Sequence, residues 1–284
     1  MRIYFLSGIL VWLLFACSNN VQQENVITVT IEPQRYFAEQ LVDTFFRIEC
    51  MVPAGTSPET YDPTPGQMTK LARSKAYFCI GHIGFEEVWI DKLKQNYPHI
   101  PFFYNSAGIN LINSGHSHPS ESHEPGVDPH TWSSPKAARL IVQNMYKALI
   151  QIDSANQKRY AGNLQLLLEE INAVDELITG ILQHSSQKAF IIYHPALTYF
   201  ARDYGLTQYS IEAEGKEPSP EQLKTILETA KEKGIKTVFI QREFDRKNAE
   251  SIAKETGCRL ITIDPLSPDW KKEMIHIAQA LSDE

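Results

Sequence analysis

The sequence predicts an α/β protein with two lobes, each built on a parallel sheet, joined by a long spanning α-helix. Three observations indicate this fold class. Short apolar runs end in loops that carry Pro, Gly or Asp, and helix-like segments separate these runs. One proline-free amphipathic segment lies midway along the chain. Strands that alternate with helices are typical of parallel sheets covered by helices. We therefore expect one such sheet in each half of the chain.

Apolar runs with the length of buried strands occur in both halves of the chain. The predicted strands cover residues 26–31, 47–52, 76–80, 100–104, 188–193, 237–240 and 259–263. With helices between them, they predict two Rossmann-like lobes. In parallel sheets, ligand-binding residues gather just beyond the carboxyl ends of the strands. Polar residues that follow these runs are therefore candidates for a site.

The segment 154–185 contains no proline, and its apolar residues recur at spacings of three and four. These residues are Tyr160, Leu164, Leu167, Ile171, Val174, Ile178 and Ile181. The pattern predicts a helix with one buried face. At 1.5 Å per residue its length exceeds about 40 Å, which is more than packing against one small lobe requires. We predict that this helix joins the two lobes; the alternative is a helix buried inside one larger domain.

The N-terminus has the pattern of an exported lipoprotein. Met1 and Arg2 precede a largely apolar run that is too short to span a bilayer, and Ala16 precedes Cys17. We predict a protein that faces the periplasm or cell surface, anchored to the membrane only by lipid on Cys17. An uncleaved anchor and an ordinary signal peptide are the alternatives. The predicted division is a signal peptide over 1–16, a lipidated polar tether over 17–25, an N-terminal lobe over 26–152, a linking helix over 153–185 and a C-terminal lobe over 186–284.

Charge and composition exclude several classes of function. The formal net charge is −7 and no Lys/Arg cluster is present, which argues against nucleic acid or an anionic lipid surface as the partner. The charge is compatible with a cationic ligand. Cys50 and Cys79 lie in strand-like runs, so buried thiols are favoured over a disulfide framework. No nucleophile elbow, phosphate loop or Gly-rich dinucleotide turn is found in the sequence.

Four candidate metal ligands lie at strand ends or in loops. His194 and Asp264 directly follow two predicted strands, and Glu59 lies in the loop beyond a third. His130 lies at a junction between a loop and a predicted helix. Two imidazoles and two carboxylates suit zinc, and also manganese or iron. The alternative is that the two carboxylates cap helices or turns.

The segment 113–127 is polar, rich in Gly, Pro and Ser, and contains His116, His118 and His123. Such a composition does not build a core. We predict that this histidine-rich loop collects metal weakly and transiently.

Several motifs occur together in the order found in one family of receptors. They cover residues 52–61 with Pro63 and Pro65, then 71–77, 81–86, 128–132 with Pro135, 193–200, 217–223 and 264–266. Over nearly its whole mature length the chain resembles the zinc- and manganese-binding solute-binding proteins of bacterial metal ABC importers, the ZnuA- and TroA-like group with a rigid linking helix. The histidine-rich loop is similar to that of the zinc-type members.

The resemblance implies a metal site between two lobes whose relative motion the long helix restricts. By motif match, His130 resembles the second ligand of the family and His194 the third, which tends to be His in zinc-type receptors and Glu in manganese-type ones. Asp264 resembles the carboxylate ligand after the last strand. The expected partner is the membrane permease of an ABC importer, and the expected state is a monomer.

Glu59 departs from the family, which usually has a histidine at this position. The change keeps a donor atom but alters its charge and softness, so Zn²⁺ is the expected cargo and Mn²⁺ or Fe²⁺ are alternatives. A second possibility is that Glu59 does not coordinate. His82 or one of the three loop histidines would then supply the missing nitrogen.

The sequence therefore predicts a metal receptor and not an enzyme. A site with four protein ligands leaves little room for the water that a catalytic zinc needs. Two other functions are alternatives: an adhesin-like lipoprotein with a structural metal, and a zinc hydrolase. The hydrolase would require an open coordination position beside an uncoordinated glutamate.

Overall fold

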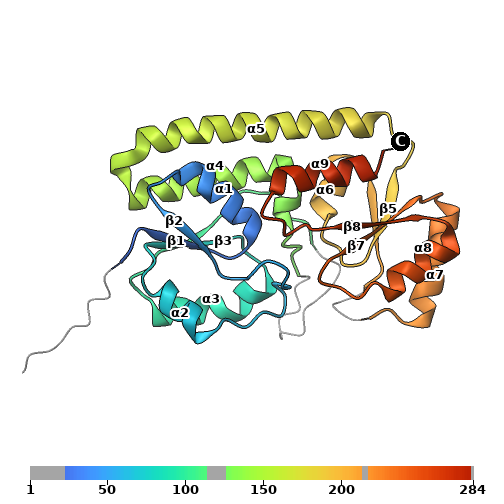
Figure 1. Ribbon diagram of the computed structural model, residues 1–284, viewed down its shortest axis with the longest axis horizontal. Helices are drawn as coiled ribbons and strands as arrows, with labels where there is room; N and C mark the ends of the chain where they lie inside the picture. The colour runs from blue at the N-terminus through green and yellow to red at the C-terminus, as the bar shows by residue number, and fades with distance from the viewer. Residues whose placement is uncertain (1–22, 114–125, 213–216, 283–284) are drawn as a thin grey trace, which may run out of the picture.

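The structure is a computed structural model that describes residues 23–113, 126–212 and 217–282 (Figure 1). The predicted signal peptide, the lipidated Cys17 and the loop histidines His116, His118 and His123 lie outside the described residues. The described chain forms two lobes, each with one four-stranded parallel sheet. The predicted fold class is confirmed.

The N-terminal lobe contains a sheet with strand order β2-β1-β3-β4. Its strands are β1 Val26–Val29, β2 Arg47–Cys50, β3 Ala76–Cys79 and β4 Phe102–Tyr104. Its helices are α1 Glu32–Val42, α2 Pro65–Leu71, α3 Gly84–Asn96 and α4 Pro135–Ile152. In Figure 1, α2 and α3 cover one face of the sheet, whereas α1 and α4 lie on the other. Strands β1 and β3 are almost wholly apolar and buried, as expected for central parallel strands.

The C-terminal lobe repeats this arrangement with strand order β6-β5-β7-β8. Its strands are β5 Ala189–Ile192, β6 Thr207–Ser210, β7 Thr237–Gln241 and β8 Arg259–Ile263. Its helices are α6 Thr198–Asp203, α7 Pro220–Glu232, α8 Lys247–Thr256 and α9 Trp270–Ala280. The sequence did not indicate β6, because this edge strand is polar and only partly buried and has no apolar run.

Helix α5, Gln157–Gln183, runs along both lobes (Figure 1). It packs against α1 and α4 of the N-terminal lobe and against α9 of the C-terminal lobe. Its buried residues are Tyr160, Leu167, Ile171, Val174, Ile178 and Leu182. All but Leu182 belong to the predicted stripe, whose other members, Leu164 and Ile181, are partly buried. At the middle of α5, the Glu170 carboxylate accepts a hydrogen bond from the Tyr36 hydroxyl (2.5 Å) and pairs with the Lys271 ammonium (3.0 Å). One side chain of the linking helix therefore contacts a residue from each lobe.

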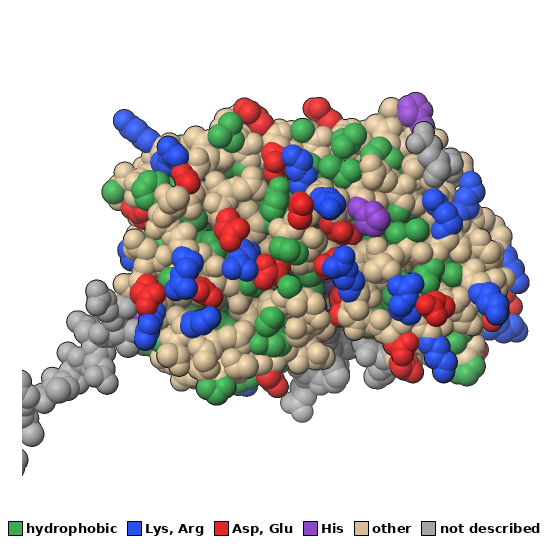
Figure 2. Space-filling view, viewed as in Figure 1, with side chains coloured by type: hydrophobic (Ala, Val, Ile, Leu, Met, Phe, Trp, Pro, Cys, Tyr) green, Lys and Arg blue, Asp and Glu red, His purple; other side chains and the backbone are tan. Residues whose placement is uncertain are grey.

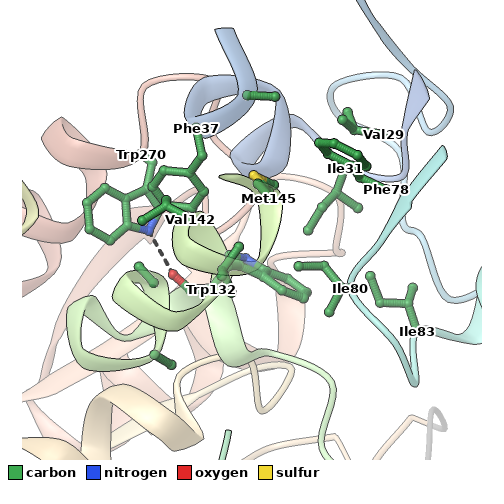
Figure 3. Packing of buried hydrophobic residues seen from close by; sticks show 14 of the residues in the cluster. Val29, Ile31, Phe37, Phe78, Ile80, Ile83, Trp132, Val142, Met145 and Trp270 are labelled. Atoms are coloured by element: carbon green, nitrogen blue, oxygen red, sulfur yellow. Dashed lines mark hydrogen bonds between the residues drawn. The ribbon is translucent and has the colours of Figure 1, made fainter. Parts of the chain in front are cut away.

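A buried aromatic contact joins the lobes directly (Figure 3). The Trp270 indole N–H donates to the Trp132 carbonyl at 2.7 Å, and the Trp132 indole N–H donates to the Pro265 carbonyl at 2.9 Å. The rings of Phe37 and Trp270 pack edge to face with centroids 5.0 Å apart. Both tryptophans are fully buried, and one continuous hydrophobic core includes residues of both lobes. The two lobes are therefore packed together, not merely tethered by α5.

The surface of the described chain is mixed in charge. On the face seen in Figure 2, acidic and basic side chains alternate without a continuous basic patch. None of the helices in the described part is long and apolar enough to cross a membrane. Cys79 is buried, Cys50 and Cys258 are partly buried, and all three are free thiols.

We predict that Trp132→Phe weakens the contact between the lobes. The substitution keeps most of the ring but leaves the buried Pro265 carbonyl without its donor, which costs about 1–3 kcal/mol. Urea unfolding should show this loss. Trp89→Phe is the matched control, because Trp89 donates to Asp62 at an exposed site and its loss should stay within about 0.5 kcal/mol. Equal losses in the two variants would contradict a special role for the contact at Trp132.

Candidate metal centre

Two imidazoles, one from each lobe, meet where the lobes join. His130 precedes the short 3₁₀ turn Thr131–Ser133 of the N-terminal lobe, and His194 lies two residues after the end of β5 in the C-terminal lobe. Their Nε2 atoms are 3.2 Å apart. His130 is only 7% exposed. The structure therefore brings together two of the four predicted ligands.

Each imidazole contacts a carboxylate through its Nδ1 atom, while its Nε2 atom faces the other ring. The Nδ1 atom of His130 lies 2.9 Å from Asp128 Oδ1, and Nδ1 of His194 lies 3.2 Å from Glu212 Oε2. A carboxylate that accepts from Nδ1–H fixes the tautomer and leaves Nε2 unprotonated, as at many zinc sites. With Nδ1 protonated on both rings, the two Nε2 lone pairs would lie within 3.2 Å of each other. Such a pair favours a cation between them.

The charges around His130 oppose the effect of burial. Burial lowers the pKa of His130, but the Asp128 carboxylate more than offsets this, with contributions from Glu59 and Glu212, so that the pKa is raised above its usual value. Burial raises the pKa of Asp128, but the interaction with His130 outweighs it, and that pKa is lowered. The surroundings of His130 thus favour a positive charge on or next to the ring.

Glu59 lies in the loop between β2 and α2, and its charge contributes to the raised pKa of His130. Its Oε2 atom accepts from the Gly84 backbone N–H at 3.2 Å, whereas Oε1 is buried without a hydrogen-bond partner. A Cβ atom at residue 84 would lie 2.7 Å from the backbone oxygen of Glu59 and 2.7 Å from its Oε2, so the close approach of the two backbones requires glycine here. A buried carboxylate oxygen without a partner is costly unless a cation or donor completes it.

Asp264 directly follows β8, as predicted, but no hydrogen bond or ion pair joins it to either imidazole in the described chain. Its Oδ2 atom lies 3.7 Å from Nη1 of Arg242. Burial raises the pKa of Asp264, while Arg242 and the Leu266 backbone N–H lower it, and the net pKa is raised. Within residues 23–113, 126–212 and 217–282, no group of three His, Cys, Asp or Glu side chains is arranged to hold a metal ion.

The alternative nitrogen donor His82 lies on the turn after β3, is exposed, and has a left-handed backbone with φ of 65°. It lines a cavity of about 440 Å³ in the N-terminal lobe together with Glu86 and Tyr104. Glu86 is buried and accepts from the Ile80 and Gly81 backbone N–H groups at 2.9 and 2.5 Å. Burial raises the pKa of Glu86 to about 7. Its contacts hold the turn that carries His82.

Several residues of the site were not singled out in the sequence. Asp128 stands two residues before His130, and this spacing is a usable signal for a carboxylate that orients an imidazole. Glu212 follows β6, so it had no signal once that strand was not predicted. Gln241, at the end of β7, donates from Nε2 to the His194 carbonyl at 2.6 Å and accepts from the His194 N–H at 3.3 Å. The Phe244 ring stacks on the His194 ring, with centroids 5.4 Å apart and planes 20° apart.

Comparison with known proteins places the chain in one family. The family model for the periplasmic zinc-uptake complex component A, ZnuA, matches residues 27–283. A crystal structure of ZnuA has a TM-score of 0.85 and 36% identity, over 91% of this chain and 99% of that one. A putative metal-binding protein of Chlamydia trachomatis is 26% identical over 100% of both chains. The zinc-binding protein AdcA of Streptococcus pyogenes is 25% identical over 87% of this chain, which spans only 52% of AdcA.

An α/β protein with two lobes, a rigid spanning helix and one imidazole from each lobe at their junction is a solute-binding protein of the metal-receptor class. More particularly, the chain belongs to the ZnuA family, the periplasmic zinc-binding solute-binding proteins of metal ABC importers. The resemblance found in the sequence is confirmed. The laminin-binding adhesin of Streptococcus agalactiae shares this fold, with a TM-score of 0.79 at 22% identity.

We predict that Asp128→Asn lowers the pKa of His130, because the charge that raises it is removed while the burial that lowers it remains. Histidine ring signals followed by NMR titration of the metal-free protein measure this directly. Glu212→Gln provides the comparison, since its carboxylate contributes less to the pKa of His130 and should cause a smaller shift. A His130 pKa unchanged by Asp128→Asn would contradict the assigned pairing.

Proposed function

We propose that this protein captures Zn²⁺ outside the cytoplasm and delivers it to the membrane permease of an ABC importer. The observation that carries the proposal for this particular chain is the pair of facing Nε2 atoms 3.2 Å apart. Two nitrogen ligands of a tetrahedral zinc, each bonded at 2.0–2.1 Å, lie about 3.3 Å from each other. Zinc therefore fits between the two rings with little movement of either lobe.

The proposed ligands are His130, His194, Glu59 and Asp264. The unpartnered Oε1 of Glu59 and the effect of its charge on His130 support Glu59. The position of Asp264 after β8 supports it, although its carboxylate must compete with Arg242 for the metal. The relatives named as zinc-binding proteins favour Zn²⁺ over Mn²⁺ or Fe²⁺, whereas the oxygen donor at Glu59 is the feature that would admit those ions.

We further propose that binding occurs without turnover, by a monomer that is attached to the membrane through lipid on Cys17. The pattern before Cys17 supports acylation. A relative named as the zinc-binding lipoprotein AdcA, from Streptococcus pneumoniae, is 26% identical over 89% of this chain and supports the same form of attachment.

Metal content is the decisive test of the proposed function. After reloading with equimolar zinc, manganese and iron, elemental analysis should find about one equivalent of zinc in the parent protein. His194→Ala should retain much less, because one of the two facing nitrogens is gone. His184→Ala is the matched control, since this exposed histidine lies at the end of α5 and its ring contacts the Gln183 side chain.

A preference for manganese or iron would mean that Glu59 shifts the metal selectivity of the site away from zinc. Absence of retained metal from both the parent and the His194→Ala protein would refute the assignment of the site. Equal zinc in these two proteins would refute the role of His194.

Metal affinity should depend on pH through His130. A metal ion and a proton compete for Nε2, and the pKa of His130 is raised above 6.5, so zinc affinity should fall as pH drops through this raised value. Fold stability of the metal-free protein should behave in the opposite way. The protonated His130 stabilises it fully below about pH 6.5, and this contribution is lost as pH rises through the raised pKa. Zinc affinity that stays constant from neutral to mildly acidic pH would contradict the two-histidine site.

A further inference from the structure

The Tyr199 side chain reaches from one lobe into the other. It lies on α6 of the C-terminal lobe and is fully buried. Its hydroxyl accepts a hydrogen bond from the Ile112 backbone N–H at 3.2 Å and donates one to the Asp128 carbonyl at 2.7 Å. Burial raises the pKa of Tyr199 to about 12, so the hydroxyl keeps the proton that it donates. One side chain of the C-terminal lobe therefore binds two main-chain groups of the N-terminal lobe.

The two main-chain partners of Tyr199 are also paired with each other. The Asp128 N–H donates to the Ile112 carbonyl at 2.9 Å, and the next residues inward, Asn113 and Val127, form an antiparallel bridge. In a hydrogen-bonded antiparallel pair, a second bond would run from the Ile112 N–H to the Asp128 carbonyl. The Tyr199 hydroxyl binds both of these groups, so it is inserted where the two segments meet.

Asp128 passes this restraint on to His130. Its Oδ1 atom accepts from the His130 backbone N–H at 2.9 Å and lies 2.9 Å from Nδ1 of the ring. Both residues are buried. Because Tyr199 holds the carbonyl of Asp128 while its carboxylate contacts His130 twice, the Tyr199 hydroxyl limits where the His130 ring can lie.

The same stretch of the C-terminal lobe carries the other imidazole. His194 stands five residues before Tyr199, and its Nε2 atom lies 3.2 Å from Nε2 of His130. This stretch therefore meets the Asp128 segment at two points, at the pair of rings and at the Tyr199 hydroxyl. Two contacts between the same segments fix their relative placement better than one.

We propose that Tyr199 positions His130 through Asp128 and so sets the separation of the two imidazoles. This inference rests on the proposed capture of a divalent metal, because the placement of the nitrogens decides how well they bind the ion. Loss of the hydroxyl leaves the Ile112 N–H and the Asp128 carbonyl without their partner and lets the His130 ring shift. Metal binding then weakens although both imidazoles are still present.

Tyr199→Phe removes only the hydroxyl. Competition with a chromophoric chelator should show about a tenfold loss of Zn²⁺ affinity, the lower end of the range for changes to groups that orient metal ligands. Tyr204→Phe is the matched control, because this hydroxyl at the end of α6 donates to Asp175 of α5 at 2.6 Å, and its loss should change affinity less than twofold. Thermal unfolding of the metal-free proteins checks that each variant is folded.

The ¹⁵N signals of the His130 ring in the metal-free proteins separate positioning from a general loosening of the lobe interface, because they report the tautomer and surroundings of that ring. We expect them to change in Tyr199→Phe and to stay as in the parent in Tyr204→Phe. Unchanged ring signals in Tyr199→Phe, or a loss of affinity no larger than that of Tyr204→Phe, would overturn the proposal.

Hydrogen exchange of the Ile112 amide tests the contact in the parent protein itself, without any substitution. The amide should exchange slowly because its partner is a buried hydroxyl, and rapid exchange would also overturn the proposal. The ring signals and the amide exchange need no metal. They are therefore distinct from failure of the proposed function, in which the parent itself would retain no zinc.

Discussion

The buried contact between Trp132 and Trp270 is the constraint on which the site depends. Each imidazole of the candidate centre belongs to a different lobe, so their separation is fixed only if the lobes keep one orientation. Each indole N–H donates a hydrogen bond to a backbone carbonyl of the other lobe, and the Phe37 ring packs against Trp270. The two lobes therefore share a hydrophobic core at this point. Helix α5 adds a second connection through Glu170. Close packing of this kind resists the large hinge motion seen in many receptors.

Rigid lobes change what capture and release require. With the lobes held, a metal ion at the proposed site would enter or leave only through movements of side chains and loops around the two imidazoles. The carboxylates of Asp128 and Glu212 hold the two rings in one orientation, with both Nε2 atoms at the junction of the lobes. Preorganisation of this kind lowers the ordering cost of binding. Loss of metal from the proposed site would then depend on local changes, such as protonation of a ring or displacement of a carboxylate.

The periodicity of apolar residues was sufficient to predict most of the fold. The stripe from Tyr160 to Ile181 predicted α5, and the apolar runs predicted every strand except β6. Strand ends also pointed to His194 and Asp264. The side-chain partners were harder to predict, because pairs such as Arg242 with Asp264 and His194 with Glu212 depend on how neighbouring strands pack.

The contact between Gly84 and Glu59 has a consequence for how this protein can evolve. The two residues are 25 positions apart in the sequence, yet the start of α3 approaches the glutamate too closely to admit any side chain at residue 84. A mutation at 84 would displace the backbone of residue 59, whatever side chain that residue carried, because the added Cβ would lie 2.7 Å from its carbonyl oxygen. The loop of residue 59 can therefore keep its place only while residue 84 stays glycine, which couples the two positions although they are far apart in the sequence.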